Sequence, residues 1–254
     1  MRIAVLTQDD PFYLGQNLNY LFRKLSSEIE VCGCVVFDPS PFGKRLSLFE
    51  KVAQTIKIFG LPFFIHYALK AILNKLNPIN SVSYVLRKNG VHKLVLSKNV
   101  NHPESIEQIK KLKPELLVSI AGNQIFKKAL INLAIKGCIN LHTSLLPKYR
   151  GLMPSFWVLK NHETETGVSV FFVDEGIDSG AIIVQKRVPI TTKNQQKLIV
   201  RTKRIGMEAL YEAIEKIHNG NVNLIDNPDD EMTYYSFPTK NDVKQFLAAG
   251  NKFY

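Results

Sequence analysis

Cysteine is scarce in this sequence, whose 254 residues include only three, Cys32, Cys34 and Cys138. Cys32 and Cys34 alternate along an apolar run that is typical of a strand, so their side chains should face opposite sides. No spacing among the three matches a metal-binding motif or a disulfide framework. This usage fits a reducing compartment. Because residues 1–7 also lack the apolar core and cleavage site of a signal peptide, we expect a cytoplasmic protein.

Glycine-rich loops and long hydrophobic runs are missing as well. The first loop, Gln8–Gly15, contains one glycine and matches neither the dinucleotide-binding nor the P-loop pattern, which argues against NAD or ATP. The most apolar stretch, residues 56–69, is interrupted by a lysine, a proline and a histidine, and it falls short of the ~20 apolar residues that span a membrane. We predict a helical insertion at about 47–77, with two helices broken at 60–62 and packed on the core. A membrane-surface or partner-binding role is the alternative.

Short apolar runs alternate with segments of helical periodicity along most of the chain. Strands are predicted at 2–7, 30–37, 116–120, 138–142 and 167–173, and helices near 18–25, 103–112, 124–135 and 195–219. This alternation predicts an α/β protein with a Rossmann-like, mostly parallel sheet and helices on both faces. We place a catalytic domain at 1–190 and a C-terminal helix with an aromatic-rich tail at 191–254.

A polar motif follows the predicted strand at 138–142. Asn140 and His142 are two residues apart, so they should point the same way from that strand. An asparagine amide suits a carbonyl oxygen, while a histidine can donate to a developing oxyanion or move a proton near neutral pH. Asp178 could orient the imidazole, stabilise its charged form, or take a proton from an attacking amine. An isolated Asn-x-His pair is more often structural, so the surrounding residues decide its meaning.

The string Asn140-Leu141-His142-Thr143-Ser144-Leu145-Leu146-Pro147, with Asp178-Ser179-Gly180 downstream, resembles the folate-dependent formyltransferases. That family includes glycinamide ribonucleotide formyltransferase, methionyl-tRNA formyltransferase and nucleotide-sugar N-formyltransferases. The resemblance is close over 115–190 and holds only in outline near the N-terminus. It implies the formyltransferase fold with a short C-terminal appendage, catalysis by Asn140, His142 and Asp178, and N10-formyltetrahydrofolate as the formyl donor, without a metal. It also favours Asp178 over the rival carboxylate of Asp174.

Binding residues are assigned on the same resemblance. The predicted folate-binding set is Ala121, Gly122, Asn123, Val173 and Gly176, and the predicted acceptor-binding set is Ser144, Lys148 and Arg150. The turn at 121–124 would suit a helix cap equally well. His162 could join His142 and Asp178 as a metal ligand, but no tight histidine spacing supports that alternative.

Charge and length bear on the acceptor. A net charge of +11 favours anionic partners, although the lysines and arginines are spread along the chain as on an ordinary solvated surface. Methionyl-tRNA formyltransferases carry a further C-terminal domain, and the chain after Gly220 is too short for one. We therefore expect an enzyme that formylates an amino sugar, preferably nucleotide-linked, with no nucleic-acid partner.

Several alternatives stay open. The acceptor could be another small amine, or water could hydrolyse the formyl donor. A different class of protein, a catalytically silent basic binding protein on the same scaffold, is also compatible with the charge. The aromatic tail could cover the core, form a homodimer contact, or stack on a nucleotide base.

Overall fold

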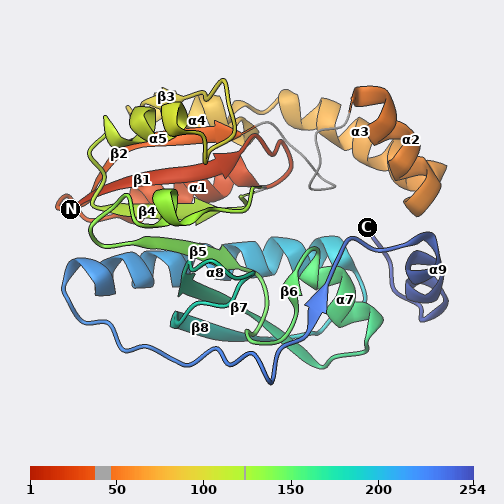
Figure 1. The fold of residues 1–254 in the computed structure, drawn as a ribbon. Coiled ribbons are helices and arrows are strands. Elements are labelled where there is room, and N and C mark those ends of the chain that lie inside the picture. The colour runs from red at the N-terminus through yellow and green to blue at the C-terminus, as the bar shows by residue number, and fades with distance from the viewer. Residues whose placement is uncertain (38–46, 123) are drawn as a thin grey trace.

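A computed structural model describes residues 1–37, 47–122 and 124–254. Its main feature is a seven-stranded sheet in the order β3-β2-β1-β4-β5-β7-β8 (Figure 1). Five strands are parallel: β1 (Arg2–Gln8), β2 (Glu30–Phe37), β3 (Lys93–Leu94), β4 (Leu116–Ile120) and β5 (Cys138–His142). β7 (Glu165–Phe172) and β8 (Ile182–Pro189) complete the sheet by antiparallel pairing. The predicted Rossmann-like, mostly parallel sheet is confirmed.

Helices cover both faces of the sheet, as predicted. One face carries α1 (Leu14–Lys24), α4 (Val82–Lys88) and α8 (Gln195–His218), and the other carries α5 (Pro103–Lys110) and α6 (Lys128–Ile131). The near-continuous apolar strands explain this arrangement, because every residue of β4 is buried. Gly206 lets α8 approach β5 closely, since a Cβ at that position would lie 3.0 Å from Leu141 Cδ2. α8 comes after residue 190, yet it packs into the same core as the strands that precede that residue. A domain boundary at residue 190 stays a prediction.

The predicted length of the helix at 124–135 is wrong, because α6 has only four residues. The apolar spacing in this segment is helical, yet contacts with residues 99–101 hold its first part in another conformation. The Asn101 side chain accepts from Lys127 N at 2.8 Å and donates to Ile125 O at 2.8 Å. The second bond uses the Ile125 carbonyl, which a longer helix would need as an acceptor in its own first turn.

The insertion forms the predicted pair of helices, α2 (Leu48–Phe59) and α3 (Leu61–Lys75), which meet at Gly60. A short 3₁₀ helix, η1 (Pro78–Asn80), leads from them to α4. Phe59 stacks on Phe63 at a centroid distance of 4.5 Å, and both rings contact Phe253 of the C-terminal tail. No helix among the described residues is long and apolar enough to cross a membrane.

The C-terminal tail covers a separate aromatic core, which confirms the first of its predicted roles. After α8 the chain runs back along the molecule to β9 (Tyr234–Tyr235), which pairs with β6 (Arg150–Gly151), and then forms α9 (Lys240–Ala248) (Figure 1). Phe246 of α9 is fully buried against Phe156 of α7 (Pro154–Lys160), with ring centroids 4.7 Å apart. The tail therefore connects the α2–α3 pair of helices, which we call the hairpin, with α7 and the main sheet. A homodimer contact and a cytoplasmic location stay predictions.

Candidate active site

A cavity of about 1070 Å³ lies beside the ends of β1, β4 and β5 and is closed by the loop that follows β7. Asn140, His142 and Asp178 all line it, although they come from separate elements. Among the residues that the structure describes, none hydrogen-bonds to the Asn140 side chain, which is half-buried in the wall. The amide is therefore available to a ligand. The structure thus brings the three predicted catalytic residues together.

The His142 ring is hydrogen-bonded at one nitrogen, and its other nitrogen faces a carboxylate. Nε2 lies 2.8 Å from the carbonyl oxygen of Tyr149, and Nδ1 lies 3.6 Å from Asp178 Oδ2. A carbonyl only accepts, so we assign the proton of the neutral ring to Nε2. Nδ1 is then the ring atom that faces the carboxylate and can gain a proton beside it. The 3.6 Å separation is too long for a hydrogen bond and suits an ion pair once Nδ1 is protonated.

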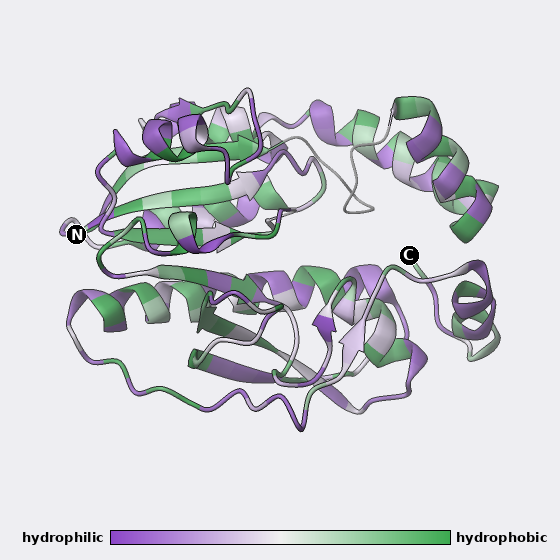
Figure 2. Ribbon diagram, in the orientation of Figure 1, coloured by the Kyte–Doolittle hydropathy of each residue, from purple (hydrophilic) through white to green (hydrophobic). Residues whose placement is uncertain are grey.

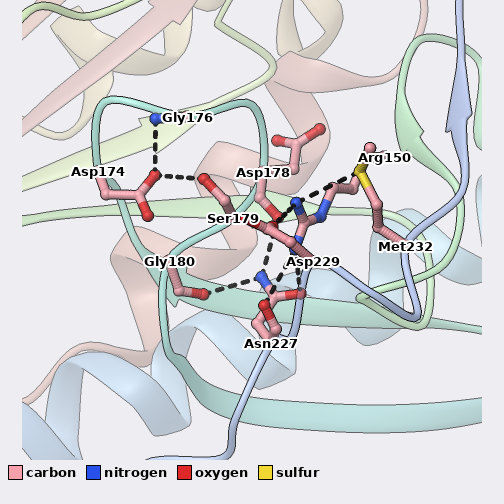
Figure 3. Close-up of polar contacts among 9 residues, drawn as sticks. All are labelled: Arg150, Asp174, Gly176, Asp178, Ser179, Gly180, Asn227, Asp229 and Met232. Carbon is pink, nitrogen blue, oxygen red and sulfur yellow. Dashed lines mark hydrogen bonds and ion pairs between the residues drawn. The ribbon is translucent and has the colours of Figure 1, made fainter.

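Asp178 is fixed by its neighbours on both its side chain and its backbone. Oδ2 accepts from Gly151 N–H at 2.9 Å, and the Asn227 amide donates to the backbone oxygens of Asp178 and Gly180, both at 2.9 Å (Figure 3). The residue has a φ of 50°, in the left-handed region that is unfavourable for a residue other than glycine. Asn227, from the tail, therefore fastens the loop in this conformation. The sequence carried no signal for this role.

The rival carboxylate, Asp174, shapes the same loop. Its Oδ1 accepts from Gly176 N at 3.0 Å and from Ser179 Oγ at 2.5 Å, which closes the turn on itself (Figure 3). Asp174 also lines the cavity, but in the described part of the chain the carboxylate at ion-pair distance from the His142 ring is that of Asp178. Geometry therefore favours Asp178 as the partner of the imidazole.

The predicted acceptor-binding residues Ser144, Lys148 and Arg150 are not among the residues that line this cavity. Arg150 is only 3% exposed and donates to Asp229 Oδ1 at 2.6 Å and to Asn227 O and Oδ1 at 3.0 and 3.1 Å. Ser144 is fully buried and donates to Lys148 O at 2.9 Å, while the Lys148 side chain is exposed outside the cavity wall. These contacts stabilise the 144–151 loop and the tail. Direct substrate contact by the three residues stays a prediction.

The predicted folate-binding residues do border the cavity. Ala121, Gly122, Val173 and Gly176 line it, whereas Asn123 lies outside the described residues. Ala121 and the neighbouring wall residue Met153 both have a φ of 53°. Unfavourable backbone conformations often gather at functional sites, where the surrounding structure maintains them.

Several residues that line the cavity were not predicted from the sequence. Lys203 of α8 contributes a cation to the wall, and its Nζ lies 5.8 Å from the centroid of the Tyr13 ring. Gln8, Asn17 and Lys127 add polar groups. Lys203 lies one helical turn before the buried Met207, so helical spacing on α8 was the available signal. Nothing in the sequence indicated that this turn faces a cavity.

The loop that holds His142 is supported from outside the cavity. Tyr149 donates its hydroxyl to Glu163 Oε1 at 2.5 Å, and burial together with this bond raises the pKa of Tyr149. The phenol consequently stays protonated as a donor, which fixes the residue whose carbonyl accepts from His142. His162 is exposed, and within the described ranges no group of three His, Cys, Asp or Glu side chains could hold a metal ion.

The sequence is similar to that of known formyl transferases. The formyl transferase family model matches residues 70–214. A methionyl-tRNA formyltransferase from Kosmotoga olearia is 37% identical over 197 residues, covering 77% of this chain and 61% of that protein. The chain spans about half the length of another matching methionyl-tRNA formyltransferase, from Citrifermentans bemidjiense (48%).

Solved structures share the fold at low sequence identity. Glycinamide ribonucleotide transformylase 1 from Symbiobacterium toebii has a TM-score of 0.61 and 18% identity, over 89% of this chain and 94% of that one. The N-formyltransferase from Helicobacter canadensis, in complex with folinic acid and dTDP-3-aminofucose, has a TM-score of 0.59 and 18% identity, over 97% of this chain and 79% of that one. The predicted formyltransferase fold is therefore confirmed.

Proposed function

Because this chain belongs to the formyl transferase family, we propose that it is an enzyme that transfers a formyl group from N10-formyltetrahydrofolate to the amine of an amino sugar. The observation that carries this proposal is the meeting of Asn140, His142 and Asp178 at one cavity. An amide with no partner among the described residues, an imidazole whose Nδ1 faces a carboxylate, and that carboxylate, fixed by Gly151, supply the groups that acyl transfer needs.

The residues act in complementary ways on one tetrahedral centre. The Asn140 amide and the protonated Nδ1 of His142 donate to the formyl oxygen as it gains negative charge. Asp178 stabilises the imidazolium and accepts, directly or through water, the proton that the acceptor nitrogen loses after its attack. As the tetrahedral centre collapses, the bond between the formyl carbon and N10 of the donor would break, and the departing nitrogen would take up that proton, so that tetrahydrofolate leaves. The Tyr149 carbonyl keeps the opposite ring nitrogen occupied, so the imidazole does not rotate away.

The cavity suits a large planar donor. Its volume of about 1070 Å³ reaches the upper end of the range for small-molecule sites, and its wall combines apolar side chains with exposed backbone at Ala121 and Gly122. N10-formyltetrahydrofolate would supply the activated formyl carbon. Val173 and Gly176 on the opposite loop would hold the other side of the ring system.

The acceptor is proposed on charge and on the named neighbours. Lys203 and Lys127 place positive charge in the cavity wall, and this favours an anionic group such as a nucleoside diphosphate linked to the amino sugar. The Helicobacter canadensis neighbour is named with such a ligand, dTDP-3-aminofucose. The Kosmotoga olearia relative instead favours methionyl-tRNA as the second candidate acceptor.

A direct competition experiment tests the assignment. We expect kcat/KM for a nucleotide-linked amino sugar to exceed that for the free sugar, for glycinamide ribonucleotide and for methionyl-tRNA, because the nucleotide provides binding free energy that positions the amine. The free nucleoside diphosphate should inhibit competitively. A preference for methionyl-tRNA would replace the acceptor and preserve formyl transfer, whereas the absence of folate binding in calorimetry would contradict the enzyme itself.

A further inference from the structure

The second helix of the insertion turns its apolar side to solvent. Six large apolar residues of α3 and its C-terminal cap are 47% to 78% exposed, and we call them the α3 stripe: Leu61, Ile65, Leu69, Ile72, Leu73 and Leu76. Their spacing by three and four residues places them on one face of the helix. A contiguous row of leucine and isoleucine on the surface differs from the scattered apolar residues of ordinary surfaces and indicates an interaction site.

Polar residues of α3 face the protein and fix this orientation. Lys70 Nζ lies 3.3 Å from the Tyr13 hydroxyl, and the Asn74 amide donates to Pro11 O at 3.0 Å. His66 stacks on Tyr254 with ring centroids 3.7 Å apart. Rotating the helix to bury the stripe would break all three contacts. The outward position of the stripe is therefore built into the packing.

The hairpin is also basic. α2 and α3 together contain four lysines and one glutamate, and the carboxylate of that residue, Glu50, accepts from the Ser47 hydroxyl and backbone in a capping box. Lys57 and Lys75 are exposed, and Figure 2 shows hydrophobic residues interspersed with hydrophilic ones along the projecting hairpin. The whole chain carries a charge of +11. An apolar stripe beside lysines is the pattern of a helix that lies in the interface of an anionic bilayer.

The charge of the hairpin favours an anionic bilayer over a second copy of the chain as its partner. In a two-fold dimer the same patch faces itself, so the hairpin lysines of one copy would approach those of the other. Such like-charge contacts oppose association, whereas anionic headgroups attract both lysines and leave the stripe to enter the acyl boundary. We propose that the α2–α3 hairpin docks this protein on an anionic membrane surface through the α3 stripe.

The hairpin also contacts the chain segment that leads into the cavity wall. The Tyr13 hydroxyl contacts Lys70 of α3, and the next residue, Leu14, lines the cavity. The ammonium of Lys203, another wall residue, lies over the same tyrosine ring. Residues 11–13, which contact α3, thus lie directly before the wall residue Leu14. This proposal concerns location and does not depend on the proposed formyl transfer.

Vesicle co-sedimentation of the full chain tests the docking surface. We expect binding to vesicles of phosphatidylcholine mixed with phosphatidylglycerol, and binding at least about tenfold weaker to phosphatidylcholine alone, because two or more lysines each contribute roughly fivefold. The double variant L69S/L73S should bind the mixed vesicles about tenfold more weakly or worse, since it removes apolar area from the contact. K57E/K75E should lose affinity for the mixed vesicles and little for neutral ones.

A matched control uses exposed apolar residues outside the hairpin. Val95 and Ile135 are 65% and 90% exposed, so V95S/I135S removes comparable surface apolarity and should bind vesicles like the unmodified protein. Circular dichroism melting verifies that each variant is folded. Equal binding by L69S/L73S and the control, or no binding by the unmodified protein, would overturn the proposal. A dimer in light scattering that L69S/L73S abolishes, without vesicle binding, would assign the stripe to a second copy.

Discussion

The candidate active site and the α2–α3 hairpin depart from the usual distribution of side chains in opposite directions. At the site and in the loop that supports it, charged and polar groups are enclosed: the side chains of His142 and Asp178 are 9% and 14% exposed, and Arg150 of the supporting loop is 3% exposed. On the hairpin, Leu73 and Leu76 are 63% and 78% exposed, while Lys70 faces inward. Both arrangements cost folding free energy relative to a conventional one.

The difference lies in how each region accommodates that cost. The enclosed side chains of His142, Asp178 and Arg150 have specific partners within the chain, although Arg150 Nε has none among the described residues. The α3 stripe has no such compensation within the described part of the chain. Violations of the general pattern are expected where function requires them, and on the hairpin we propose that an external partner supplies the missing contacts.

The largest effect should come from removing the enclosed catalytic groups. His142→Ala and Asp178→Ala should each lower kcat/KM by on the order of 100-fold or more, because in the proposed mechanism both act on the same transition state. The double variant should lose less than the product of the single losses. Steady-state formylation with the preferred acceptor measures this, with exposed His162→Ala as the matched control. Near-normal turnover of His142→Ala would place the chemistry elsewhere.

Removing the enclosed cation should affect stability more than removing an exposed one. Arg150→Met eliminates bonds to Asp229 and Asn227 and should lower the free energy of unfolding by about 2–3 kcal/mol. Arg187→Met removes an ion pair with Glu165 in which the arginine side chain is 71% exposed, and it should cost less than about 1 kcal/mol. Urea denaturation measures both. Equal losses would show that the burial of Arg150 adds nothing to the free energy of unfolding.

The sequence predicted those parts of the molecule that depend on local pattern. Alternating apolar runs located β2 at its exact bounds, and the break at Gly60 divided the insertion correctly. The strand pattern placed Asn140 and His142 on one face, while their catalytic role was assigned by resemblance. Asp178 was chosen by resemblance, and its ion-pair distance to His142 supports that choice.

Features that depend on distant contacts were not predictable from local pattern. Asn227 reaches the Asp178 loop across 49 positions of sequence, and Arg150 meets Asp229 across 79. The short α6 results from bonds with Asn101, which override the helical spacing of its own segment. In each case a side chain that was ordinary in sequence gained its role from a tertiary neighbour.

A smaller effect is expected from the tail residue that fastens the catalytic loop. Asn227→Ala removes both donors to the 178–180 backbone, so Asp178 should sample other positions and kcat should fall about tenfold with little change in KM. Asn223→Ala, exposed in the same segment, is the control. If Asn227→Ala raises KM and leaves kcat unchanged, the residue acts in binding, and the loop does not depend on this contact.

The smallest effect is expected on the hairpin when no membrane is present. L69S/L73S should change the free energy of unfolding by about 0.5 kcal/mol or less per substitution, because both side chains are already more than half exposed. Leu18→Ala, at a fully buried position of α1, should by contrast cost about 2–5 kcal/mol. Urea denaturation of the three proteins in vesicle-free buffer gives the comparison. A loss above about 2 kcal/mol for L69S/L73S would mean that the stripe is packed within the folded chain. The hairpin and the site would then no longer differ in needing an external partner. A negligible loss, combined with weakened vesicle binding, would show that these leucines contribute to association and little to folding.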